Sequence, residues 1–169
     1  MGRPTTYPIH TAQAVSAPWH LDVGMEPPLG AHLVTPRHGY SHHGIYVGHG
    51  NVVHYAGLAE ALRRGPVEEV SIERFAAGYQ VSIKPSPQPA YGENEAVQRA
   101  RSRLGENRYR LLTNNCEHFC AWCLYGVSRS QQVRACFIDP RAALQTAICL
   151  LTAILSAALQ LRHIGSSVA

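Results

Sequence analysis

The fold of this chain is decided by one stretch, His42-His43-Gly44-Ile45-Tyr46-Val47-Gly48-His49-Gly50-Asn51-Val52-Val53-His54. Two runs rich in Ile, Val and Tyr flank a glycine-bounded loop at Gly48–Gly50, which is typical of a β-hairpin. If all three residues form the loop, Gly44 pairs with His54. His42 and His54 then project from the same sheet face as diagonal neighbours.

The register of this hairpin depends on the length of its turn. A two-residue turn at His49-Gly50 would invert the alternation and place His43 on the face of His54 instead. Glycines at both ends of the loop favour the three-residue reading, because a glycine can take a left-handed bulge position. We therefore expect the pair His42 and His54, with His43 as the alternative.

Outward from the hairpin, the pattern predicts a small α+β domain with an antiparallel sheet packed on two helices. The prolines of residues 84–91 indicate a loop, and Thr113-Asn114-Asn115 supplies a helix N-cap. The expected segments are strands at Ala31–Val34, Val67–Ile72 and Tyr79–Ile83, a helical turn at Glu73–Ala77, an extended piece at Tyr109–Leu112, and helices at Glu93–Leu104 and Cys116–Tyr125, the last ending at Gly126.

Cys116 is the candidate nucleophile. It directly follows the predicted cap at the start of a helix, where unpaired N–H groups and the helix dipole stabilise a thiolate and can bind an oxyanion. Cys120 and Cys123 lie further along the same helix and are expected to be small core residues. A thiolate needs an imidazole as its base, and seven of the ten histidines lie between residues 20 and 54. His118 lies two residues after Cys116 and therefore points to nearly the opposite side of a helix, about 160° away.

Two segments resemble boxes of the lecithin:retinol acyltransferase family. Residues 42–48, followed by Val52-Val53-His54, are similar to its histidine box, and Asn115-Cys116-Glu117-His118-Phe119 is similar to its cysteine box. The resemblance covers about residues 30–126. Bacterial members are common in this family, which also includes phospholipase A/acyltransferases. Where this chain has His43, family members usually have Trp.

The resemblance implies a circularly permuted papain-like fold of the NlpC type and catalysis by Cys116, His42 and His54. Tyr40 and Asn115 are candidates for oxyanion binding or support. The expected activity is cleavage of a phospholipid acyl ester through a Cys116 thioester, without a cofactor or metal. Water as acceptor would make the enzyme a hydrolase, and an amine or alcohol would make it an acyltransferase.

The C-terminal part of the chain differs in character. Residues 142–161 carry no charge and are about long enough to cross a hydrocarbon core, although Gln145, Thr152, Ser156 and Gln160 form one narrow polar stripe. This segment is read as a membrane anchor or, alternatively, as a helix packed on the domain or in an oligomer. We expect an irregular lead-in over 1–29, a catalytic domain over 30–128 and an apolar helix over 139–163.

Composition limits the function classes. With 46% hydrophobic and 15% charged residues the chain is globular, and a formal charge of +4 without a basic, aromatic-interleaved block argues against nucleic acid. Five cysteines, an odd number, indicate a reducing compartment. We expect a cytoplasmic protein that contacts membrane through its C-terminal helix. Two alternatives stay open: a papain-like amidase, peptidase or deamidase with the same site, and a zinc-binding or interaction module based on the histidines and Cys120-x-x-Cys123.

Overall fold

The computed structural model describes residues 19–20, 26–60, 63–139, 141, 144–145, 147–148 and 151–152. Among them lie six strands and four helices. The strands are β1 (Trp19–His20), β2 (His32–Arg37), β3 (Tyr40–Gly48), β4 (Asn51–Glu60), β5 (Arg63–Ser71) and β6 (Ser82–Ile83), and the helices are α1 (Ile72–Ala76), α2 (Glu93–Ser102), α3 (Cys116–Tyr125) and α4 (Gln131–Ile138).

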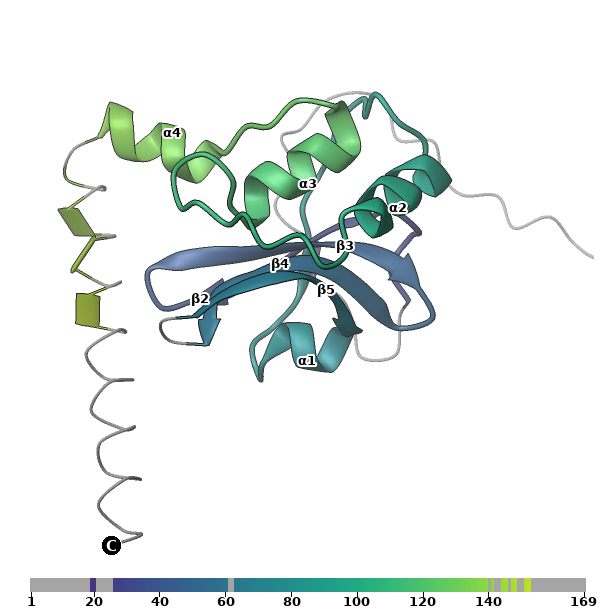
Figure 1. The fold of residues 1–169 in the computed structure, drawn as a ribbon, viewed down its shortest axis with the longest axis horizontal. Helices are drawn as coiled ribbons and strands as arrows, with labels where there is room; N and C mark the ends of the chain where they lie inside the picture. The colour runs from purple at the N-terminus through teal and green to yellow at the C-terminus, as the bar shows by residue number, and fades with distance from the viewer. Residues whose placement is uncertain are drawn as a thin grey trace, which may run out of the picture.

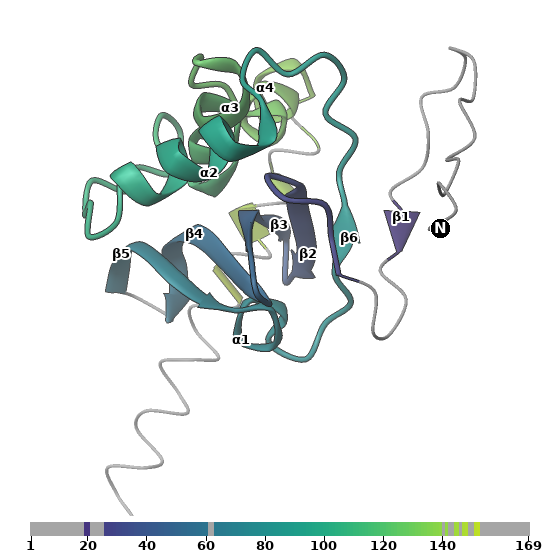
Figure 2. The same ribbon diagram turned by 90° about the vertical axis from the view of Figure 1, so that its right-hand side faces the viewer.

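The strands form one antiparallel sheet in the order β1-β6-β2-β3-β4-β5. Helices α2 and α3 cover one face and the short α1 lies against the other (Figures 1 and 2). Each face has its own core. Ile45 and Val53 pack with α2 and α3, whereas Tyr46 and Val52 pack with Phe75 of α1. The expected α+β class, with an antiparallel sheet on two helices, is confirmed.

The β3–β4 hairpin combines features of both turns that the sequence allowed. His49 and Gly50 form a two-residue turn, and both have positive φ (53° and 70°). A bulge before Gly48, whose φ is 89°, then restores the alternation of the longer loop. Gly44 therefore pairs with His54, as the three-residue reading predicted.

Helix α3 has the predicted bounds, with Asn115 as its N-cap and Gly126 as its left-handed C-cap. The helical turn after β5 and the helix after the proline-containing loop are also present. The extended piece at Tyr109–Leu112 was wrong: Arg110 and Asn114 form an isolated bridge that closes a tight turn. Helix α4 was not predicted from the sequence, and it begins beyond the expected domain end at residue 128.

Much of each terminal segment lies outside the described residues. Of the lead-in over 1–29, residues 19–20 form β1, and Glu26–Leu29 precede β2. Of the segment 142–161, the described positions are helical, with Leu144, Ile148 and Leu151 exposed. Within the described part of the chain, no helix combines the length and the apolar character needed to cross a bilayer.

Candidate active site

The nucleophile candidate Cys116 is fixed by the capping of α3. The Asn115 side chain accepts hydrogen bonds from the backbone N–H groups of Glu117 and His118, and the His118 ring in turn accepts one from the Asn115 backbone N–H. A second bond runs from Asn115 Nδ2 to the Leu111 carbonyl at 2.8 Å, which ties the preceding turn to the helix. Asn115 therefore supports the site through both ends of its amide, and His118 is a capping residue.

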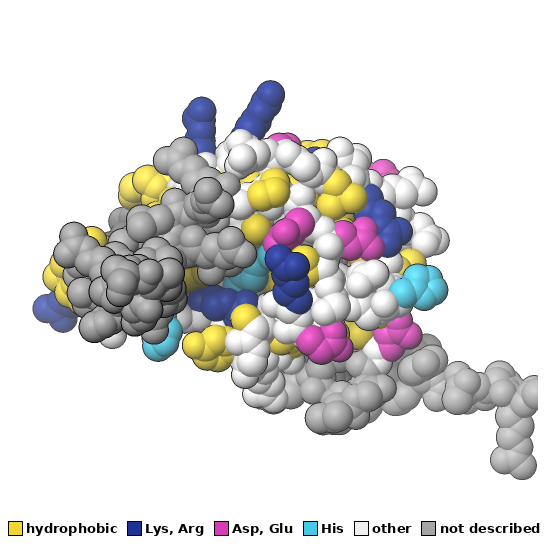
Figure 3. Space-filling view, turned by 60° about the horizontal axis from the view of Figure 1, so that its bottom comes forward, with side chains coloured by type: hydrophobic (Ala, Val, Ile, Leu, Met, Phe, Trp, Pro, Cys, Tyr) yellow, Lys and Arg dark blue, Asp and Glu magenta, His cyan; other side chains and the backbone are white. Residues whose placement is uncertain are grey.

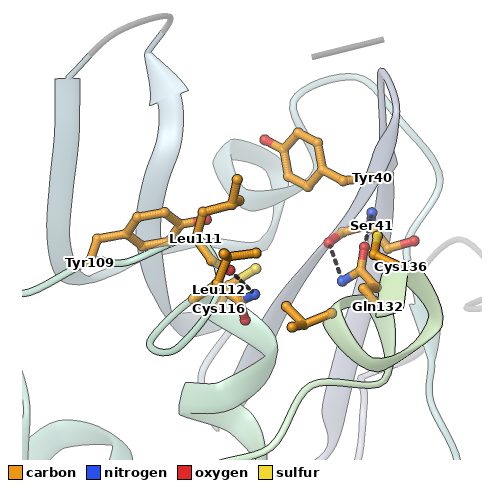
Figure 4. Close-up of a pocket in the computed structure, with 10 residues that line it drawn as sticks. Tyr40, Ser41, Tyr109, Leu111, Leu112, Cys116, Gln132 and Cys136 are labelled. Carbon is orange, nitrogen blue, oxygen red and sulfur yellow. Dashed lines mark hydrogen bonds between the residues drawn. The ribbon is translucent and has the colours of Figure 1, made fainter. Parts of the chain in front are cut away.

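Cys116 opens onto a cavity of about 90 Å³ between the turn before α3, the start of β3 and helix α4 (Figure 4). The apolar part of the lining comes from Leu111, Leu112 and Val133, and Tyr40 lies across the cavity from the two leucines. Cys136 of α4 lines the same cavity. The shape and lining suit an apolar group presented to the Cys116 sulfur.

His42 and His54 form the expected pair. Their rings are joined by a hydrogen bond of 2.8 Å between His42 Nε2 and His54 Nδ1, and they meet edge to face at 88°. Both rings contact Phe75 of α1, with ring centroids 5.3 and 5.6 Å apart. The bond leaves Nδ1 of His42 as the ring nitrogen that could take a proton from a thiol.

The histidine pair and Cys116 approach the sheet from different sides. The rings lie on the face of α1, whereas α3 packs on the opposite face. Among the described residues, the β3–β4 pairing runs from Gly48 to Gly44 and does not include His42 or His43. The Cys116 sulfur accepts a hydrogen bond from the His43 backbone at this end of the ladder, one residue from His42. That His42 acts as its base stays a prediction.

His43, the alternative base, lies on the α3 face with both ring nitrogens occupied. Nδ1 is 2.8 Å from His32 Nε2, and Nε2 is 3.0 Å from the side-chain nitrogen of Gln132. A base needs a free lone pair directed at the proton it removes. His43 therefore fits a structural role better than the role of base.

Glu117 is the centre of a buried polar network, which the simple dipole role expected from the sequence does not describe. Its carboxylate is only 3% exposed and accepts bonds from Lys84 at 2.8 Å, from the Ser130 hydroxyl and from the Gln132 backbone at 3.0 Å. Burial raises the pKa of Glu117, but His43, Lys84 and these hydrogen bonds together lower it to about 2.

Gln132 is the site residue that sequence reasoning missed. Its side chain binds the backbone of Ser41 twice: it accepts from the Ser41 N–H at 2.9 Å and donates to the Ser41 carbonyl at 3.2 Å (Figure 4). This clamp holds β3 between Tyr40 and His42. The signal in the sequence was slight, namely Ser130 as an N-cap and apolar residues at 133, 136 and 137.

The acid–base groups of the site rest in neutral form. Burial raises the pKa of Cys116 to about 11, and the backbone hydrogen bonds from His43 and Glu117 do not offset it. The thiolate expected from the helix start is thus not the resting state. Burial lowers the pKa of His54 to about 4, and it lowers that of His42 as well, assisted by His54 and Arg37. A neutral imidazole able to accept a proton therefore accompanies a thiol.

Metal chemistry has little support in the described part of the chain. Within it, no group of three or more His, Cys, Asp or Glu side chains could hold a metal ion. Cys120 and Cys123, which together with the histidines suggested the zinc alternative, are fully buried residues of α3.

Comparison with known proteins identifies relatives of this chain. The family model described as lecithin retinol acyltransferase matches residues 25–129. Phospholipase A and acyltransferase 2 from Homo sapiens is 36% identical over 126 residues, covering 63% of this chain and 76% of that protein. Lecithin retinol acyltransferase from Bos taurus is 30% identical over 156 residues, covering 72% of this chain and 68% of that protein.

The fold and the site together define an α+β domain with an antiparallel sheet, a buried thiol at the capped start of a helix and a hydrogen-bonded histidine pair on the sheet. The chain belongs to the lecithin retinol acyltransferase family. Its similarity to named acyltransferases and phospholipases supports an enzyme.

Proposed function

We propose that this protein is a thiol acyltransferase or phospholipase that removes an acyl chain from a phospholipid ester through a Cys116 thioester. The observation that carries the proposal is the placement of Cys116 at the capped start of α3 and on an apolar-lined cavity, where its sulfur accepts a hydrogen bond from the backbone of His43, the β3 residue next to His42. The names of its relatives support the same chemistry.

In the first half-reaction, His42 Nδ1 takes the thiol proton as the Cys116 sulfur attacks the acyl carbonyl carbon. The tetrahedral oxyanion is stabilised by donors at the start of α3. Asn115 Oδ1 already accepts the N–H groups of Glu117 and His118, so the backbone N–H of Cys116 and the hydroxyl of Tyr40 are the donors we assign. The C–O bond then breaks, and the leaving alkoxide takes the proton from His42.

In the second half-reaction, an acceptor attacks the thioester carbonyl while His42 removes its proton. The Cys116 sulfur leaves and takes that proton back, which returns the enzyme to its resting thiol form. His54 orients the His42 ring throughout, because its Nδ1 is bonded to His42 Nε2. Water yields a fatty acid, and an amine or alcohol yields an acylated product.

A lipid substrate suits the surroundings of the cavity. At the C-terminal end of α4, Phe137 is 76% and Ile138 71% exposed, and the cavity-lining Leu111 and Leu112 are partly exposed as well. Exposed apolar side chains beside a cavity mouth favour contact with lipid. We propose that the apolar residues within 142–161 extend this contact to a membrane.

Intact-mass measurement after mixing with phosphatidylcholine vesicles tests the proposal. We expect a gain of one acyl chain in the wild-type protein and none in Cys116→Ala. Cys136→Ala is the matched control, because that thiol lines the same cavity, and it should keep the gain. Acylation that persists in Cys116→Ala would overturn the proposal. Comparing fatty-acid release with peptide cleavage separates the ester from the amide reading.

A further inference from the structure

The histidine pair is continued by a third side chain on β5. His54 on β4 pairs directly with Glu68 on β5, so the two side chains project from the same sheet face. His54 Nε2 lies 3.3 Å from Glu68 Oε1. In the described part of the chain, Glu68 forms no ion pair other than this contact with His54.

The ring nitrogen that faces Glu68 has no hydrogen-bond partner. His54 Nε2 is buried, and the angle to Glu68 lies outside hydrogen-bond geometry although the distance is short. A buried ring nitrogen without a partner is costly. A small rotation of the Glu68 side chain, which is 33% exposed, would close the bond. Hydrogen bonds between catalytic groups are commonly loose in unliganded sites.

A cavity of about 260 Å³ surrounds this contact on the face of α1. Its charged lining consists of Arg37 from β2, Arg74 from α1 and Glu68 from β5. Figure 3 looks towards this side of the molecule, where basic, acidic and histidine side chains lie close together near the centre. Among the described residues, Glu68 is thus the single carboxylate that lines the cavity, next to two arginines and two imidazoles.

We propose that Glu68 is a positioning residue that accepts the Nε2–H of His54 and thereby sets the tautomers of both histidines. The proposal rests on the proposed function of Cys116 and His42. A carboxylate can only accept, so the His54 proton must lie on Nε2 and His54 Nδ1 must itself accept. His42 then donates from Nε2, which leaves the lone pair of His42 Nδ1 for the thiol proton.

Glu68 also balances the charge of the site when His42 becomes protonated. Arg37 and Arg74 disfavour a positive imidazole, and the ring of His43 acts on His42 in the same direction. The Glu68 carboxylate, at the far end of the row His42–His54–Glu68, favours the imidazolium formed during acylation. Glu68 acts through His54 and does not touch the substrate.

Steady-state kinetics of Glu68→Gln on a soluble short-chain ester test the proposal. We expect kcat to fall on the order of tenfold, with KM unchanged, because an interaction of the transition state is weakened. The acid limb of the kcat profile should move to lower pH, since the imidazolium loses its carboxylate. Glu69→Gln is the matched control: this neighbour projects from the opposite face, pairs with Arg101 and should leave both quantities unchanged.

A readout independent of turnover is the ring-nitrogen NMR spectrum of His54. In the wild-type protein we expect the Nε2–H tautomer, and in Glu68→Gln a mixture, because an amide can donate as well as accept. An unchanged tautomer together with an unchanged acid limb would overturn the role of Glu68. If neither the wild-type protein nor Glu69→Gln turned over the ester, this would instead count against the proposed function.

Discussion

The neighbouring histidines His42 and His43 differ in how many of their ring nitrogens are hydrogen-bonded. His42 has one ring nitrogen bonded to His54, whereas His43 is bonded at both nitrogens, to His32 and Gln132. The hairpin alternation predicted which histidines would share a face. It could not predict that both ring nitrogens of His43 would be hydrogen-bonded, since Gln132 lies about 90 residues further along the chain.

Substituting each histidine separately tests this division. We expect His42→Gln to abolish acylation of Cys116 by a phospholipid, because the base is lost, while the fold is retained. His43→Gln should keep acylation and instead lower the free energy of unfolding by about 1–3 kcal/mol, because His32 loses its buried partner. Intact mass and urea denaturation measure the two effects. Acylation lost in His43→Gln and kept in His42→Gln would reverse the assignment.

Among the secondary-structure elements, α4 binds the strand that carries the site histidines, yet the sequence gives little sign that this helix exists. It is only eight residues long and has no buried residue of its own, so hydrophobic periodicity barely marks it. Helix α3, by contrast, was predicted to the residue because Asn115 and Gly126 are standard cap residues at both ends. Local capping chemistry is visible in a sequence, whereas docking by one side chain is not.

The docking of α4 can be tested with two neighbouring glutamines. We expect Gln132→Ala to lower kcat, because the strand between Tyr40 and His42 loses its clamp at Ser41. Amide hydrogen exchange at the start of β3 should become faster for the same reason. Gln131→Ala, at an exposed position one residue earlier, is the control and should change neither. Equal effects in both variants would mean that α4 matters only as a helix.

Across the whole molecule, buried neutral histidines make stability depend on pH. Burial lowers the pKa of His43 and His54 to about 4, below the value near 6.5 of an unfolded chain. The unfolded state therefore binds more protons between these values, and the free energy of unfolding falls as the pH falls. Above pH 6.5 this contribution is fully present. Glu117, with its pKa lowered to about 2, adds a second loss below about pH 4.5.

Urea denaturation at pH 7 and pH 5 checks this expectation. Each of the two imidazoles should cost on the order of 2 kcal/mol at pH 5. As the pH is lowered, this loss of unfolding free energy should come before protonation of the carboxyl groups, because the histidines are protonated on unfolding at higher pH. A free energy of unfolding that is equal at pH 7 and pH 5 would show that the rings are charged or solvated in the native protein.

The bulge before Gly48 sets the sheet face of the histidines and therefore constrains any redesign of this hairpin. The bulge and the two-residue turn each shift the alternation by one position, and together they cancel. If the strand kept all its residues but paired without the bulge, with the two-residue turn retained, Ile45 instead of Gly44 would lie opposite His54, and His43 would share the sheet face of His54. In this hairpin, the single unpaired residue of the bulge therefore decides which imidazoles meet.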